Sequence, residues 1–249
     1  MCLDRADTGN KKLLTSLRGA HARGTLCVST HSDDSICFAW QMLARGVLPE
    51  PVHHVVVFSE SQHITRSLVP EVLPERAKAT RLQEDRRFCA YWGMSCHHLG
   101  FPDRSLDHRA VSPTSALVRD IARRLRSACA RLRCSFVLCS RPWGTHVHSH
   151  HLAVFHAASA LVREIRSLVL LLADDQPYSR IPLHATVSCN ERQHRPLSIN
   201  MTELQMRQKT LAMRAFYKTQ MVDSYLLAAR QPALGADGKF SETLWLPSS

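Results

Sequence analysis

The stretch TLCVSTHSDDSICFAWQML, residues 25–43, changes its pattern twice within a short distance. Its first part, Thr25–Thr30, is β-rich and apolar, whereas Ser35–Arg45 has apolar side chains at helical spacing. A short polar segment separates the two parts. A strand that leads through a polar loop into a helix is the unit from which α/β folds are built, so this stretch decides the expected fold class.

The same alternation of strand and helix recurs along the chain. Further strands are expected at His53–Ser59, Cys96–Phe101 and Ser135–Ser140, and further helices at Pro74–Trp92, Ser115–Arg133, His151–Arg166 and Thr202–Ala229. This order predicts an α/β fold, a Rossmann-like three-layer sandwich in which a mainly parallel sheet is covered by helices on both faces. No repeat or low-complexity tract divides residues 1–249, which predicts a single domain. Ligand sites in such sheets lie outside the carboxyl ends of the strands.

The composition predicts a folded protein of the cytoplasm. Of the 249 residues, 45% are apolar, which is enough for a full core. The longest aliphatic run, Leu168–Ala173, is far shorter than the roughly 20 residues that span a bilayer, so no membrane span is expected. The N-terminus carries acids where a secretory signal has basic residues. The nine cysteines are odd in number and form no C-x-x-C pair, which indicates reduced thiols.

Three potential metal ligands stand within four residues in the first predicted strand-to-helix loop. His31 offers an imidazole nitrogen, and Asp33 and Asp34 offer carboxylate oxygens, a set that suits a catalytic divalent metal such as zinc. Neighbouring side chains on a loop diverge, so one carboxylate can bind metal while the other faces the water. Aspartate is also favoured as a helix N-cap, and from this motif alone both interpretations stay open.

Four histidines stand in the six residues HVHSHH, 146–151, which follow the fourth predicted strand and open the next helix. This motif is therefore expected at the same edge of the sheet as the first one. His148 and His151 are three residues apart, so both imidazoles can point into one space. A His–Asp–His metal site is the leading hypothesis, and its donors also suit non-haem Fe(II). For His150 a ligand and a bystander position both stay open, whereas His156 is expected to be a bystander.

Several ordered motifs carry a more specific resemblance. THSDDS at residues 30–35 is similar to A-H-P-D-D-E, and HSHH at residues 148–151 is similar to H-P-D-H. ERAKATRLQE at 75–84 is similar to an R-R-x-E helix, HLGFPD at 98–103 to an L-G-x-x-D strand end, and KTLAMRAFYKTQ at 209–220 to a K-x-x-A-L-x-x-Y-x-S-Q helix. Together these motifs resemble the PIG-L/LmbE-like family of metal-dependent N-acetylglucosaminyl de-N-acetylases, over about residues 24–246.

The resemblance implies a chemical role for each matching residue. His31, Asp34 and His151 would be the metal ligands, for Zn²⁺ or alternatively Fe²⁺ or another divalent metal. Asp33 would act as the general base, and His148 as the general acid and oxyanion stabiliser.

The resemblance also implies a substrate class and its contacts. Arg81 and Asp103 would contact substrate at the rim of the site, and His146 is expected at the pocket wall. The implied reaction is removal of an N-acetyl or other N-acyl group from an amino sugar or glycoside-like small molecule by metal-activated water, as in a bacterial natural-product or small-molecule pathway. The net charge of +11 would steer an anionic substrate, with Arg81 as the residue to test.

Two other classes of function come from features that the family pattern does not contain. Ser32 and Ser149 replace prolines, and His150 replaces an acid that could orient neighbouring imidazoles. Ser35 stands where Glu or a small residue is common. These departures suggest, as the alternative, a metal- or sugar-binding protein that has lost catalysis. The basic charge suggests nucleic-acid binding. No nucleic-acid partner is expected, because the arginines of Ser115–Arg133 form one helix face and only 6% of residues are aromatic. The oligomeric state stays open.

Overall fold

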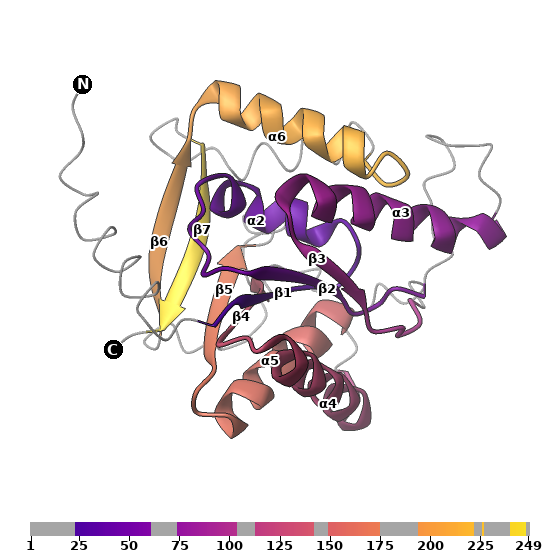
Figure 1. Cartoon of the computed structure of the whole chain (residues 1–249), viewed down its shortest axis with the longest axis vertical. Helices are drawn as coiled ribbons and strands as arrows, with labels where there is room; N and C mark the ends of the chain where they lie inside the picture. The colour runs from indigo at the N-terminus through magenta and orange to yellow at the C-terminus, as the bar shows by residue number, and fades with distance from the viewer. Residues whose placement is uncertain are drawn as a thin grey trace.

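The computed structural model describes residues 23–60, 74–103, 113–141, 149–174, 194–221, 226 and 240–247. These residues form an α/β sandwich around one seven-stranded sheet, in the order β3-β2-β1-β4-β5-β7-β6 (Figure 1). The strands are β1 (Thr25–Ser29), β2 (Val52–Val56), β3 (Ser95–His98), β4 (Phe136–Arg141), β5 (Val169–Asp174), β6 (His194–Met201) and β7 (Phe240–Pro247). The helices are α2 (Asp34–Ala44), α3 (Pro74–Trp92), α4 (Ser115–Leu132), α5 (Ser149–Glu164) and α6 (Glu203–Phe216). The predicted fold class is confirmed.

The central strands β1 and β4 are buried throughout because helices cover both of their faces. Alternate residues of β1 point to opposite sides. Leu26 and Val28 lie in a core cluster with residues of α4 and α5, whereas Cys27 lies in a second cluster with Phe38 and Met42 of α2. Helices α2, α3 and α6 accordingly lie on one side of the sheet and α4 and α5 on the other (Figure 1).

The far end of the sheet is antiparallel. Strands β1 to β5 pair in parallel, but β7 runs antiparallel to both β5 and β6. The sheet is therefore mainly parallel, as predicted, but the sequence analysis assigned neither the parallel strand β5 nor the antiparallel strands β6 and β7. The last predicted helix, Thr202–Ala229, is too long. Helix α6 begins after a Thr202–Gln205 capping box and ends at Phe216, and residues 222–225 and 227–239 lie outside the described residues.

The helix ends early because the chain turns toward α3. The Thr219 amide N–H donates to Glu84 Oε1 at 3.0 Å, and the Thr219 hydroxyl donates to Glu84 Oε2 at 2.6 Å. A continued α-helix would place that N–H in its own backbone ladder, where it could not reach Glu84. The turn thus fixes the end of α6 against α3.

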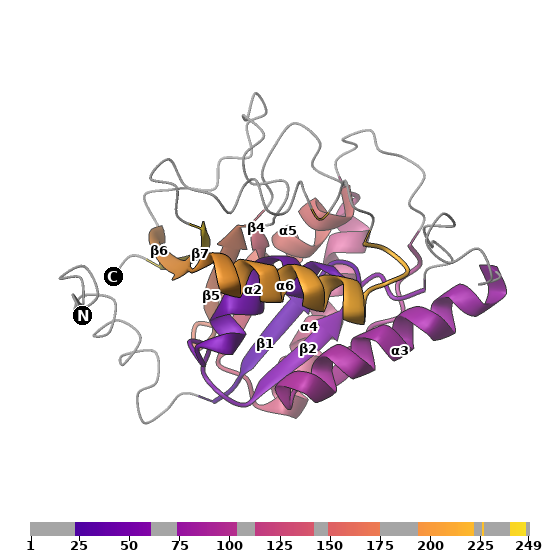
Figure 2. The same cartoon turned by 90° about the horizontal axis from the view of Figure 1, so that it is seen from above.

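The order of the strands reverses between β1 and β4. From β1 the chain proceeds outward to β2 and β3, then returns to β4 on the other side of β1. In sheets of this kind, the loops that follow the two adjacent strands open a crevice at their carboxyl ends. The loop after β1 and the start of α5, which follows β4, therefore belong to one edge of the sheet. Figure 2 shows the same elements in a view turned by 90° from Figure 1.

Within the described part of the chain, no helix is both long and apolar enough to cross a membrane. All seven cysteines in that part are free thiols: Cys27, Cys37, Cys89, Cys96, Cys129, Cys134 and Cys139.

Candidate metal centre

Two sequence motifs more than a hundred residues apart meet at this edge of the sheet. The loop after β1 carries His31, α2 begins with Asp34, and the first turn of α5 carries His151. His31 Nδ1 and His151 Nε2 each lie 3.8 Å from Asp34 Oδ2. Ligands at about 2.1 Å from a tetrahedral zinc lie about 3.4 Å apart, so two imidazoles and one carboxylate at these distances fit a divalent cation.

Hydrogen bonds orient the three candidate ligands. The His31 backbone N–H donates to Asp34 Oδ2 at 2.7 Å, which holds the carboxylate beside the His31 ring. His151 Nδ1 lies 3.4 Å from the Ser140 hydroxyl on β4, so its other nitrogen, Nε2, faces Asp34. A partner for the second ring nitrogen is the usual way in which proteins fix a metal-binding imidazole.

The two neighbouring aspartates, Asp33 and Asp34, have different surroundings in the structure. Asp33 occupies the N-cap position of α2, but its side chain makes no capping hydrogen bond. Its side chain is half-buried and lies near Glu84, on which it acts electrostatically. The interpretation of Asp33 as an ordinary side-chain N-cap is therefore wrong, whereas Asp34 has the position of a candidate ligand.

A second group surrounds the other side of the His31 ring. His31 Nε2 lies 3.2 Å from His150 Nδ1 and 3.9 Å from Asp103 Oδ1, and His150 Nδ1 lies 3.7 Å from the same Asp103 oxygen. His150 stacks on Phe58 with ring centroids 3.8 Å apart and planes at 8°. His150 is thus not a solvent-exposed bystander. His31 Nε2 and His150 Nδ1 can share one hydrogen bond, so the tautomer of His150 helps to set which His31 nitrogen carries hydrogen.

Arg81 and Asp103 are brought together, but deeper than a rim position. Their side chains are 5% and 4% exposed, and Arg81 Nη1 lies 3.5 Å from Asp103 Oδ2. Arg81 Nη2 also donates to Gln220 Oε1 at 2.8 Å. Next to Arg81, burial raises the pKa of Glu84, while the Thr219 hydrogen bonds and the charge of Arg81 oppose this rise. Arg81 therefore links α3 both to Asp103 and to the turn after α6.

His146 and His148 lie outside the described residues, so their predicted positions stay predictions. Sequence reasoning did not assign His150, Glu84, Gln220 or Phe58 to the neighbourhood of the site. His150 belongs to the quoted histidine motif, which was a signal for it. Glu84 and Gln220 end two of the motifs quoted above, which were a signal for them, whereas the position of Phe58 depends on packing that no local pattern reveals.

The fold and the site together are those of an α/β protein with a candidate metal centre, a His–Asp–His cluster, at the carboxyl edge of its sheet. A family model described as PIG-L, GlcNAc-PI de-N-acetylase, matches residues 26–162, more than half of the chain. The chain belongs to this family. No curated protein sequence matches the chain.

Solved structures with the same fold cover nearly the whole chain. The A40926 pseudoaglycone deacetylase Dbv21 has a TM-score of 0.69 at 22% identity, covering 90% of this chain and 96% of that one. The zinc-inhibited form of teicoplanin deacetylase Orf2 has a TM-score of 0.64 at 20% identity, with coverage of 91% and 99%. The N,N'-diacetylchitobiose deacetylase from Pyrococcus horikoshii has a TM-score of 0.59 at 15% identity, with coverage of 98% and 94%. Likeness at these identities shows the shared fold.

Proposed function

We propose that this protein is a metal-dependent hydrolase that removes an N-acetyl or other N-acyl group from an amino sugar or a glycoside-like small molecule. The observation that carries the proposal is the convergence of His31, Asp34 and His151, whose ligand atoms all lie within 4.8 Å of one another. The family membership and the deacetylases among the structural neighbours support the reaction class. Neighbours named as an A40926 pseudoaglycone deacetylase and a teicoplanin deacetylase support a role in a natural-product or small-molecule pathway.

His31, Asp34 and His151 would hold the cation, with zinc as the first candidate. Zinc is named in the structure of one neighbour, as an inhibitor, so Fe²⁺ and other divalent metals belong in the test. A divalent cation supplies a Lewis acid, which acidifies water and polarises an amide carbonyl. The two neutral imidazoles and one carboxylate leave a net positive charge, which suits a carbonyl oxygen that becomes negative during the reaction.

Asp33 is the proposed general base. Its carboxylate makes no capping bond with α2, and it follows Ser32 in the loop that carries His31. In the first step, a carboxylate oxygen of Asp33 takes the proton of the attacking water as the oxygen–carbon bond forms. His148, in its protonated form, is proposed to oppose the charge on the carbonyl oxygen. It then gives its proton to the leaving nitrogen as the carbon–nitrogen bond breaks, which yields a carboxylic acid and a free amine.

Arg81 and Asp103 are proposed to contact the substrate. Since their side chains are buried and paired with each other, a substrate contact through them would come from inside the crevice and not from its outer edge. Arg81 remains the residue to replace when anionic and neutral substrates are compared. His146 is proposed to line the pocket wall.

The expected result for Asp33→Asn is a loss of turnover of about 100-fold to 10,000-fold with metal content near that of the wild type, because a general base is removed and no ligand is. His151→Ala should lose both metal and activity. The measurement combines metal analysis with acetate release from a panel of N-acetylated amino sugars and glycosides, after loading with Zn²⁺ or Fe²⁺.

Full activity of Asp33→Asn would contradict its role as base. If the wild-type protein binds metal at His31, Asp34 and His151 but releases no acid from any member of the panel, the proposed reaction is wrong. The chain would then be a metal- or sugar-binding member of the family without this catalysis.

A further inference from the structure

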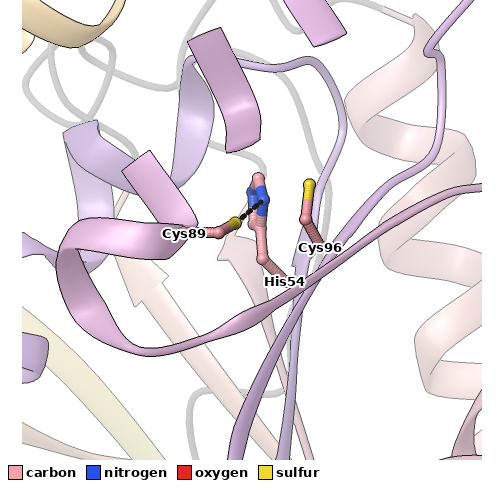
Figure 3. A group of neighbouring side chains, drawn as sticks. All are labelled: His54, Cys89 and Cys96. Carbon is pink, nitrogen blue, oxygen red and sulfur yellow. Dashed lines mark hydrogen bonds between the residues drawn. The ribbon is translucent and has the colours of Figure 1, made fainter. Parts of the chain in front are cut away.

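A second cluster of potential metal ligands lies on the face of the sheet that α3 covers, away from the carboxyl ends of the strands. His54 lies in β2, Cys96 in β3, and Cys89 in the last turns of α3 (Figure 3). His54 and Cys96 are direct partners in the parallel β2–β3 register, so their side chains leave the sheet on the same face. Cys89 approaches from the helix that packs above them, and its Sγ lies 3.3 Å from His54 Nδ1.

The three donor atoms have the spacing of a metal site. His54 nitrogen, Cys89 Sγ and Cys96 Sγ all lie within 4.8 Å of one another. With Zn–S of about 2.3 Å and Zn–N of about 2.0–2.1 Å, ligand atoms of a tetrahedral site lie about 3.3–3.8 Å apart. Two sulfurs and one imidazole form a soft donor set, which selects zinc-like or copper(I)-like cations over Mg²⁺ and Ca²⁺.

The His54 ring is held in the orientation that a ligand needs. Its Nε2 lies 3.0 Å from the Ser29 hydroxyl, which can accept its proton. That hydroxyl is held in turn by Ser35, whose backbone N–H donates to it at 3.1 Å and whose hydroxyl contacts it. With the proton on Nε2, the lone pair of Nδ1 faces the sulfurs, which is the arrangement that positions metal-binding histidines in proteins.

The two cysteine side chains also interact with each other, and they differ in exposure. A hydrogen bond from the Cys89 thiol, helped by His54 and His98 and opposed by burial, lowers the pKa of Cys96 to about 3. The same hydrogen bond, with burial, raises the pKa of Cys89. His54 and Cys89 are 0% and 2% exposed, but Cys96 is partly exposed, which leaves a route from solvent.

We propose that His54, Cys89 and Cys96 form a second metal site for a thiophilic cation of the zinc class, independent of the His31–Asp34–His151 centre. The two sites share no residue. The cation joins the end of α3 to strands β2 and β3, so its role is structural. Helix α3 also carries Arg81 and Asp85, and Asp85 Oδ2 accepts from the Ser32 hydroxyl at 3.1 Å in the loop of the first centre. Metal at the cysteine site therefore stabilises the helix that contacts that loop.

Cobalt(II) distinguishes the two sites because only one contains sulfur. The experiment titrates the reduced, metal-free full chain with Co²⁺ and records the thiolate-to-cobalt charge-transfer absorption in the near ultraviolet together with bound cobalt. The wild type is expected to bind two equivalents and to show the charge-transfer band, which excess Zn²⁺ removes. His151→Ala should bind one equivalent fewer and keep the band. This result separates the cysteine site from the proposed deacetylase centre.

Cys89→Ser and Cys96→Ser should each lose the band, whereas the matched control Cys134→Ser, which replaces another buried free thiol, should keep it. A second measurement needs no variant: Zn²⁺ should protect Cys89 and Cys96, but not Cys134, from alkylation mapped by mass spectrometry. Three results would overturn the proposal: no band in the wild type, a band that survives in both cysteine variants, or equal alkylation with and without Zn²⁺. A Cys89–Cys96 disulfide in protein that takes up no cobalt after reduction would instead identify a redox pair.

Discussion

At the scale of single residues, two glycines with similar backbone conformations provide a matched test of local packing. Gly24, directly before β1, has φ of +49°, and Gly93, between α3 and β3, has φ of +66°. A Cβ atom on Gly24 would lie 2.8 Å from the carbonyl oxygen of Pro51, whereas a Cβ on Gly93 would have no neighbour within 4 Å. That Pro51 oxygen accepts the Thr25 N–H at 2.9 Å at the start of the β1–β2 pairing, so it cannot move without loss.

Gly93→Ala is expected to cost only the left-handed backbone penalty, about 1–2 kcal/mol of the free energy of unfolding. Gly24→Ala should cost clearly more, because it adds a clash with backbone to the same penalty. Urea denaturation of both variants measures the difference. An equal loss in the two proteins would show that the strand pairing at Pro51 adjusts to the added methyl group.

For single residues, part of the candidate site could be predicted from the sequence and part could not. The positions of THSDD and HSHH after predicted strands indicated a His–Asp–His cluster at one edge of the sheet. The family resemblance then implied His31, Asp34 and His151, which the structure brings together. It could not decide whether Asp33 caps the helix, because ligands and N-caps use the same side chain at the same position. The pairing of Asp103 with Arg81 and the stacking of His150 on Phe58 depend on contacts between distant elements.

At the scale of elements, the parallel half of the fold was easier to predict than the antiparallel end. The buried central strands are short apolar runs, and α4 has its apolar residues on one face, with Ile121 and Leu125 buried. Strand β7 also alternates, but its buried positions include the charged Glu242, which masks the period of two. Glu242 can be buried because it forms an ion pair with Lys209 on α6, a contact between distant elements that the local pattern does not reveal.

This buried ion pair joins three elements and predicts a large effect on stability. Lys209 Nζ donates to Glu242 Oε1 at 2.7 Å and to the Cys37 carbonyl at 2.5 Å, and Glu242 Oε2 accepts the Gln41 N–H at 2.8 Å. Both side chains are buried, at 0% and 1% exposure. Lys209→Met should cost about 3–5 kcal/mol, because it leaves an uncompensated buried carboxylate.

Adding Glu242→Gln to Lys209→Met should recover part of that loss, since it removes the buried charge. The control is Glu164→Gln, which removes the exposed ion pair with Arg126 and should change the free energy of unfolding by at most about 1 kcal/mol. Denaturant unfolding of the three variants provides the comparison. A small effect of Lys209→Met, similar to that of Glu164→Gln, would contradict the argument from burial.

At the scale of the whole molecule, the net charge of +11 affects some of the fifteen histidines, because arginine side chains lie near them. Arginines of α4 lie on its exposed face, as the amphipathic pattern predicted, and one of them, Arg124, lies 4.5 Å above the Phe101 ring. Elsewhere, arginines lie close to two histidines, the exposed His156 and the half-buried His194. Burial, and then the charge of Arg163, lowers the pKa of His156. Burial, and then the charge of Arg141, lowers the pKa of His194. We therefore expect histidines outside the two candidate metal centres to influence the pH dependence of folding.

A folded-state pKa below the unfolded value of about 6.5 means that the unfolded chain binds more protons in acid. The stability from neutral His156 and His194 is present above about pH 6.5 and is lost as the pH falls below it toward the folded pKa values. The midpoint of urea unfolding, measured in chelator at about pH 7.5 and 5.5, should therefore fall more on acidification in the wild type than in the His156→Gln/His194→Gln variant. An equal fall in both proteins would show that the arginine-flanked histidines do not contribute to acid sensitivity, because every other titrating group is common to the two chains.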